Sequence, residues 1–150
     1  MTPFVTAGAG FLLAVLWFDL MFDVQVLRHR HGDVPDEALA SISAYYRRVT
    51  TAARPMNRLV AVVMLGTLVA IVVGLARGDA PRGTGWVSLA LAGSAILLAA
   101  TRTFPSARRL GARTDPPEEQ HRLARSICRD HLLCLTAIVV LIAVQLAFAR

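Results

Sequence analysis

Four blocks of apolar residues dominate the chain, and segments rich in arginine, proline and acidic residues separate them. The blocks cover about residues 4–26, 57–75, 85–101 and 132–149, which brings each close to the ~20 apolar residues that a helix needs to cross a bilayer. Apolar residues fill these blocks on every side instead of forming one stripe, so a soluble fold of this size could not cover them. The pattern predicts an all-α integral membrane protein whose residues 1–150 form a single four-transmembrane-helix bundle.

A shorter amphipathic segment lies between the first and second blocks. Its larger apolar side chains recur at helical spacing, at Leu39, Ile42, Tyr45, Tyr46 and Val49. We expect an interfacial helix here, because tyrosine favours the headgroup level of a bilayer and arginine can reach anionic lipid. The residues predicted to face this lipid interface are Tyr45, Tyr46, Arg47 and Arg48.

Prolines define the limits of two helices. Pro55 should separate the interfacial helix from the second span, because the residue before a proline disfavours helical geometry. No proline follows Pro117, so residues 118–148 are expected to form one continuous helix that starts ahead of the fourth span.

The arginines predict the orientation of the bundle, and all 16 basic residues are Arg. The two long connections carry Arg28, Arg30, Arg47, Arg48, Arg54, Arg102, Arg108, Arg109, Arg113, Arg122, Arg125 and Arg129. The opposite side carries only Arg77, Arg82 and Arg150. The positive-inside rule therefore puts both connections in the cytoplasm and both termini outside. An all-Arg basic set is typical of a GC-rich bacterial genome, so we expect a multi-pass protein of the bacterial cytoplasmic membrane.

Both long connections begin a helix in the same way. Asp33-Val34-Pro35-Asp36-Glu37 and Asp115-Pro116-Pro117-Glu118-Glu119 match at a constant offset, and Arg47 and Arg129 keep that offset. An acidic residue, a proline in the first turn and further acidic residues all favour a helix start. Two explanations remain open: independent selection of the same start signals, or a duplication that makes the protein two related helical hairpins.

The overall charge and the ligand-type residues narrow the class of function. The net charge is +6 and mean hydropathy is +0.54, but the positive charge lies between apolar blocks, so we expect no nucleic-acid partner. Cys128 and Cys134 are six residues apart on one helix, about 9 Å in rise, which is too far for a disulfide. Glu118 and His121 have the spacing of di-iron helices, but that motif must occur twice and here occurs once. We therefore predict no metal and no cofactor.

The strongest candidate site lies at the cytoplasmic end of the bundle. Asp19 and Asp23 are one helical turn apart within the first span, and charged groups inside a span are costly and usually functional. Polar residues on the other helices fall at a similar depth. The predicted ligand or ion-pair cluster is Asp19, Asp23, Asn57, Arg58, Arg102, Arg129, Asp130 and His131. It is either a structural network, in which the carboxylates neutralise arginine, or a pocket for a small polar or anionic ligand or for protons.

The end of the third span resembles a known family. Thr101-Arg102-Thr103-Phe104-Pro105-Ser106 through Leu110, followed by a basic helix through Arg129, is similar to the small bacterial four-span proteins grouped with anthrone oxygenase. The resemblance covers roughly the C-terminal third. Ser106 stands where the family has asparagine, and the tryptophan and histidine expected ahead of the last span are missing. The resemblance implies cofactor-independent oxygenation of an aromatic ketone.

Three functions from different classes follow from these observations. The first is a non-catalytic membrane module that binds lipid, a second copy of itself or another membrane protein. The second is a small transporter or proton-coupled carrier that uses Asp19 and Asp23. The third is an oxygenase-like membrane enzyme acting on a lipophilic or aromatic substrate, so enzymatic activity stays an open question.

Overall fold

The computed structural model describes residues 1–29, 34–79 and 81–148, and all regular structure within them is helical. Four of its helical segments are long and apolar enough to cross a membrane, which confirms the all-α fold and makes the chain a multi-pass membrane protein. They are α1 (Thr2–Asp23), which continues into the 3₁₀-helix η1 (Val24–His29), α3 (Arg54–Arg77), α4 (Arg82–Leu98) and α6 (Pro117–Ala147). A π-helix, η2 (Ala99–Thr103), joins α4 to α5 (Phe104–Ala112), and α2 (Asp36–Thr51) precedes α3.

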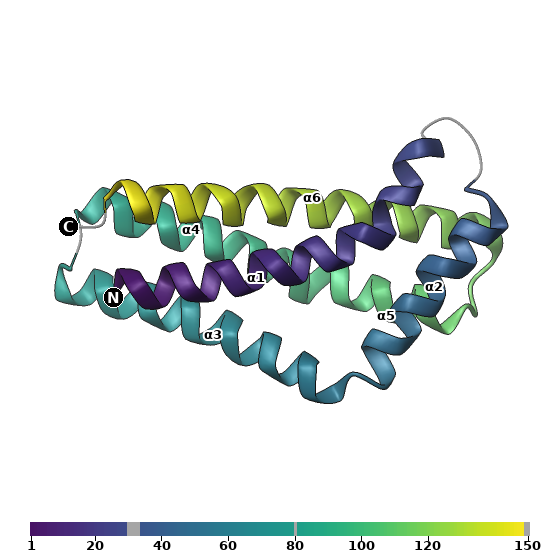
Figure 1. Ribbon diagram of the computed structural model, residues 1–150, viewed down its shortest axis with the longest axis horizontal. Coiled ribbons are helices and arrows are strands. Elements are labelled where there is room, and N and C mark those ends of the chain that lie inside the picture. The colour runs from purple at the N-terminus through teal and green to yellow at the C-terminus, as the bar shows by residue number, and fades with distance from the viewer. Residues whose placement is uncertain (30–33, 80, 149–150) are drawn as a thin grey trace.

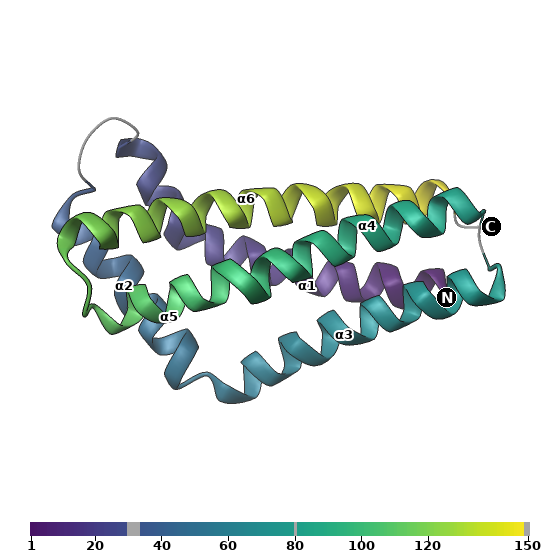
Figure 2. The same ribbon diagram turned by 180° about the vertical axis from the view of Figure 1, so that it is seen from behind.

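The helices form an elongated bundle with two different ends (Figures 1 and 2). α1, α4 and α6 run side by side, while α3 diverges from them toward the end that carries α2 and α5. α1 begins, α6 ends and α3 turns into α4 at the opposite end, which we call the termini end. At the turn, Gly78 adopts a φ of 70° and closes α3, with the Asp79 amide donating to the Gly74 carbonyl at 3.0 Å.

Two apolar cores lie one above the other along the bundle. The span core fills the half near the termini and consists of Val5, Ala9, Leu12, Ile71, Ala92, Ala95, Cys134, Ile138 and Leu141. The cap core fills the α2 end and consists of Val26, Val34, Leu39, Ile42, Tyr46, Ala107, Leu110, Leu123, Ala124 and Ile127. α6 contributes to both because its 31 residues form one continuous helix, as its sequence predicts.

The packing of α2 differs from the sequence prediction. The helix exists and ends before Pro55, as expected, but its apolar face is covered by protein, because Leu39, Ile42 and Tyr46 are buried in the cap core. The face that carries Leu39, Ile42 and Tyr46 therefore packs on protein and not on lipid, and the position of α2 at the membrane interface stays a prediction. α5 and the first part of α6 supply the apolar side chains that cover this face and remove it from water.

Gly111 lets α2 and α5 approach closely. A Cβ at this position would lie 2.7 Å from the Arg47 amide nitrogen and 3.0 Å from the Tyr46 carbonyl carbon, both of them backbone atoms. Only glycine fits against backbone at this distance. The contact fixes the height of Tyr46 along the bundle.

The third span is longer than predicted, and the predicted duplication stays untested. The third span was expected to end at residue 101, but helical structure continues without a break through η2 and α5 to Ala112. The duplication into two related hairpins stays a prediction, and its Asp33, like Arg30 and Arg150, lies outside the described residues.

Candidate functional site: a polar layer between two cores

Two carboxylates on α1 and two tyrosines on α2 meet where the span core gives way to the cap core. The Tyr45 hydroxyl donates a hydrogen bond to Asp19 Oδ1 at 2.6 Å, and the Tyr46 hydroxyl donates to Asp23 Oδ1 at 2.7 Å. Asp19 and Asp23 share a face of α1 because they are four residues apart, and the adjacent tyrosines reach one each. Phe22 stacks on the Tyr45 ring at a centroid distance of 4.1 Å, which holds that ring in place.

His131 of α6 completes this group, which we call the polar layer: Asp19, Asp23, Tyr45, Tyr46 and His131. Its Nδ1 lies 2.6 Å from Asp23 Oδ2, so the Nδ1–H donates to a carboxylate whose side chain is fully buried. Its Nε2 lies 3.8 Å from Asp19 Oδ2, which is too long for a hydrogen bond. The imidazole therefore lies between two carboxylates. It is hydrogen-bonded to the fully buried Asp23 and faces the more exposed Asp19.

The polar layer lies far along the bundle from the termini end. Asp19 is 17 residues from the start of α1 and His131 is 16 residues from the end of α6, about 25 Å along either helix. A hydrocarbon core ~30 Å thick that begins at the termini end would therefore have its other boundary just beyond the layer, toward the α2 end. The two measures agree because α1 and α6 run side by side.

The tyrosines act as fixed hydrogen-bond donors. Burial raises the pKa of Tyr46 well above its usual value, and the adjacent Asp23 charge raises it further. Burial, followed by the charge of Asp19, likewise raises the pKa of Tyr45. Both hydroxyls keep their protons across the physiological range, so a change of pH acts on the layer through the carboxylates and the imidazole.

Asp130 forms a second cluster on another face of α6, which we call the Arg–Asp–Arg cluster. Its side chain is 1% exposed, and its oxygens lie 3.7 Å from Arg102 Nε and 3.6 Å from a terminal nitrogen of Arg129. Both arginines are more than half exposed, and Arg102 also donates to Ser126 Oγ at 3.3 Å. Neither Asp130 oxygen has a hydrogen-bond partner among the described residues.

The predicted cluster is thus divided into two groups, and part of it lies elsewhere. Asp19, Asp23 and His131 come together, while Arg102, Arg129 and Asp130 form the other group. The expectation that Asp19 and Asp23 neutralise arginine is wrong, because tyrosine and histidine are their partners. Asn57 instead donates to the Val49 carbonyl at 2.7 Å, and Arg58 is exposed with no ion pair to the described part of the chain. Both sit at the start of α3, which diverges from the bundle.

The sequence did not predict that the two tyrosines belong to the polar layer. Tyr46 is 3% exposed, so its placement at a lipid-facing surface is wrong. Tyr45 is half-buried and donates to Asp19, and its contact with lipid stays a prediction. Arg47 and Arg48 are exposed, and their contact with lipid stays a prediction. The sequence signal for a face of α2 covered by protein and not by lipid is the complementary face of Ala107, Leu110 and Gly111, which has the size and spacing to cover α2.

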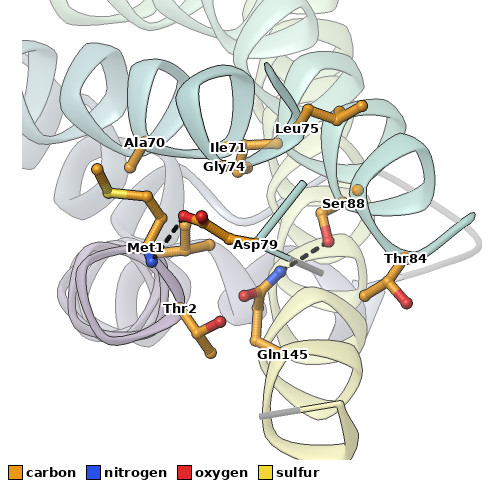
Figure 3. Close-up of a pocket in the computed structure, with 12 residues that line it drawn as sticks. Met1, Thr2, Ala70, Ile71, Gly74, Leu75, Asp79, Thr84, Ser88 and Gln145 are labelled. Carbon is orange, nitrogen blue, oxygen red and sulfur yellow. Dashed lines mark hydrogen bonds and ion pairs between the residues drawn. The ribbon is translucent and has the colours of Figure 1, made fainter. Parts of the chain in front are cut away.

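A small cavity of about 30 Å³ lies at the termini end (Figure 3). Gln145 Nε2 donates to Ser88 Oγ at 2.8 Å beside it, and the Met1 amino group pairs with Asp79 at 3.3 Å. The cavity has room for about one water molecule, so it is a packing feature and not a ligand pocket.

The described residues contain no group of three His, Cys, Asp or Glu side chains arranged to hold a metal ion. The chain matches no protein-family model, and neither a curated protein nor a solved structure is significantly similar to it. The functional argument therefore depends on the geometry of the polar layer and of the Arg–Asp–Arg cluster.

Proposed function

We propose that the protein is a non-catalytic module of the bacterial cytoplasmic membrane in which protonation of the polar layer controls the docking of α2. The observation that carries the proposal is that Asp19 and Asp23 accept both α2 tyrosines while Asp23 also holds His131. Any change in the charge of these acids therefore changes the contacts that fasten α2 to the bundle. The docking of α2 and the protonation of the polar layer are therefore coupled, so each shifts the other.

The proposed orientation puts the α2 end in the cytoplasm and both termini outside. It is supported by the arginines, which are concentrated in the two connections at the α2 end. In a background with Cys128 and Cys134 replaced by alanine, Arg113→Cys should react with an impermeant maleimide only in inverted vesicles, and Gly83→Cys only in intact spheroplasts. The reverse labelling pattern contradicts the orientation.

Acidification should release α2. The groups that face one another are the carboxylates of α1, the phenols of α2 and the imidazole of α6, with Asp130 and Cys128 nearby on α6. Protonated carboxylates accept weaker hydrogen bonds, because charge-assisted bonds are roughly twice as strong as neutral ones. They also leave a charged His131 without a counter-charge in a buried place, which is unfavourable.

Hydrogen exchange of α2 in lipid nanodiscs tests this proposal. Amides of residues 36–51 should exchange faster relative to those of α4 as the pH falls from about 7 to about 4, the range in which carboxyl and imidazole groups ordinarily titrate. Tyr46→Phe should raise exchange at every pH, and Asp23→Asn should raise it and reduce its pH dependence.

Ser43→Ala is the matched control. Ser43 is buried on the same helix, and its hydroxyl has no hydrogen-bond partner among the described residues, so its removal should leave exchange unchanged. If Tyr46→Phe behaves like Ser43→Ala and α2 exchange does not respond to pH, the proposal fails.

An oxygenase-like enzyme is a second candidate, and one observation favours it. Asp23 holds Nδ1 of His131, and Nε2 has no hydrogen bond to the described residues, which is the arrangement of the base in an Asp–His dyad. A base is what proton abstraction from an aromatic ketone requires. Oxygen consumption with such a ketone that disappears in His131→Gln supports this candidate, and the absence of consumption by the wild type rejects it.

A carrier function has less support. Nine buried apolar residues form the span core between the polar layer and the termini end, so a carrier would need to open this core to pass a proton or a solute. Uptake or proton flux in vesicles that is lost in Asp19→Asn would favour a carrier over the docking module.

A further inference from the structure

The π-helix η2 brings Arg102 against α6. A π-helix widens one turn of a helix, and such turns often occur at functional sites. Here it lies between two α-helical segments at Ala99–Thr103, and it holds Arg102 with Nε 3.7 Å from Asp130 and a terminal nitrogen 3.3 Å from Ser126 Oγ. Arg129, next to Asp130 in the sequence, approaches the same carboxylate from its other side.

The charges in this cluster do not balance. Two guanidinium groups and one buried carboxylate sum to one uncompensated positive charge. Asp130 is buried and has ion-pair distances of 3.6–3.7 Å but no hydrogen bond to the described residues, so it holds both arginines nearby without using their N–H donors. The two arginine side chains are 53% and 62% exposed, so their guanidinium groups are accessible to a ligand.

The position along the helices matches the headgroup level of a bilayer. Arg102 is 20 residues from the start of α4 and Arg129 is 18 residues from the end of α6, about 30 and 27 Å from the termini end. The hydrocarbon core is ~30 Å thick, so both guanidinium groups reach the depth at which lipid phosphates lie.

We infer that Arg102, Arg129 and Asp130 form a binding site for the phosphodiester of an anionic phospholipid. A phosphodiester carries one negative charge, which balances the one positive charge of the cluster. Its oxygens accept from guanidinium groups in the planar, two-point geometry that arginine favours. An anionic headgroup suits the site better than a zwitterionic one, whose ammonium would add positive charge beside two arginines.

Native mass spectrometry of detergent-solubilised protein tests the site, with phosphatidylglycerol, phosphatidylethanolamine and inorganic phosphate as separate probes. One phosphatidylglycerol should bind the wild type, with little binding of phosphatidylethanolamine and none of inorganic phosphate. Arg102→Gln with Arg129→Gln should lower phosphatidylglycerol affinity at least tenfold more than the control pair does. Arg102→Lys should retain part of the affinity, because it keeps the charge but not the forked geometry.

Arg58→Gln with Arg108→Gln is the control pair. It removes the same charge from the same end of the bundle, and both side chains are exposed. Arg58 is 19 residues from the end of α3, about 28 Å, which is nearly the same depth along its helix as Arg102 and Arg129. Unlike Arg102 and Arg129, the two control arginines lie on different helices, α3 and α5, and share no buried carboxylate.

Three outcomes overturn the inference. Equal losses in the two double variants would mean a diffuse basic surface with no site. Equal affinity for phosphatidylglycerol and phosphatidylethanolamine would mean that the site does not distinguish lipids by headgroup charge. Tight binding of inorganic phosphate that competes with the lipid would assign the site to a free anion. The inference does not depend on the docking of α2, which the hydrogen-exchange experiment measures separately.

Discussion

Replacing Gly111 by alanine should loosen the polar layer without contacting any of its side chains. The new Cβ would lie 2.7 Å from the Arg47 amide nitrogen, and ordinary contact begins at 3.4 Å, so α2 and α5 must separate by about 0.7 Å. Neither side can yield by rotating a side chain, because the atoms met belong to the backbone. Overpacking of this kind typically costs ~1–3 kcal/mol of unfolding free energy.

The separation should also reach the Tyr46 hydroxyl. A shift of that size along the bond lengthens the 2.7 Å contact between Tyr46 and Asp23 to the limit of hydrogen-bond distance. A hydrogen bond to a charged group contributes ~1.5–3 kcal/mol, of which part is lost. We expect a total loss of about 3 kcal/mol, at the upper end of what overpacking alone costs.

Tyrosinate absorbance provides a specific assay, because Tyr45 and Tyr46 are the two tyrosines of the chain. In Gly111→Ala, the pKa of Tyr46 should move back toward 10.0, since both its burial and its closeness to Asp23 decrease. The pKa of Tyr45 should change less, because its ring stays stacked on Phe22.

Gly93→Ala is the matched control for Gly111→Ala. A Cβ at Gly93, within α4, meets nothing within 4 Å, so alanine there should be neutral or stabilise by up to ~1 kcal/mol. If Gly111→Ala unfolds at the same temperature as Gly93→Ala and both tyrosines titrate as in the wild type, the argument that α5 positions α2 is refuted.

Three further predictions test other contacts. Tyr46→Phe should destabilise the protein in micelles by ~2 kcal/mol by thermal unfolding, and Ser43→Ala by nearly nothing, because only the first removes a hydrogen bond to a charged acceptor. The pKa of Tyr45 and that of Tyr46 are raised in the folded protein, so their contribution to stability is complete below pH ~10. It should fall as the pH rises from there toward the folded pKa, and unfolding measured as a function of pH will show this decrease. Gln145→Leu should cost ~1–2 kcal/mol by leaving the buried Ser88 hydroxyl unpaired, and adding Ser88→Ala should restore part of that loss in the same unfolding measurement.

The architecture could be predicted from the sequence because its causes are local. Four long apolar blocks specify four spans whatever their neighbours are, and Pro55 fits the first turn of α3, where its missing N–H leaves no helical hydrogen bond unmade. The amphipathic spacing of Leu39, Ile42 and Tyr46 also identifies the buried face of α2 correctly. It does not identify what covers that face, because lipid and protein both satisfy an apolar stripe.

The candidate site was less predictable because partners are chosen by tertiary packing. Asp19, Asp23 and His131 stand out as polar residues inside spans, and they do meet. Arg58 has the same depth along its helix but lies on α3, and no local pattern reports that α3 diverges from the bundle. The π-helix that contains Arg102 was not predicted either, because the spacing of apolar residues does not distinguish one widened turn within a long helix.

The polar layer also has a consequence for biosynthesis. Asp23 and His131 are 108 residues apart, so at a translation rate of ~5–20 residues per second the acid enters the membrane roughly 5–20 s before the histidine exists. Tyr46, only 23 residues after Asp23, is synthesised within seconds and can accompany the carboxylate in the meantime. In the nascent chain, Tyr46 can thus serve as a hydrogen-bond partner for the buried Asp23 carboxylate before His131 is made. A Tyr46→Phe chain should therefore be degraded by membrane proteases during synthesis more often than the stability of the mature protein alone explains.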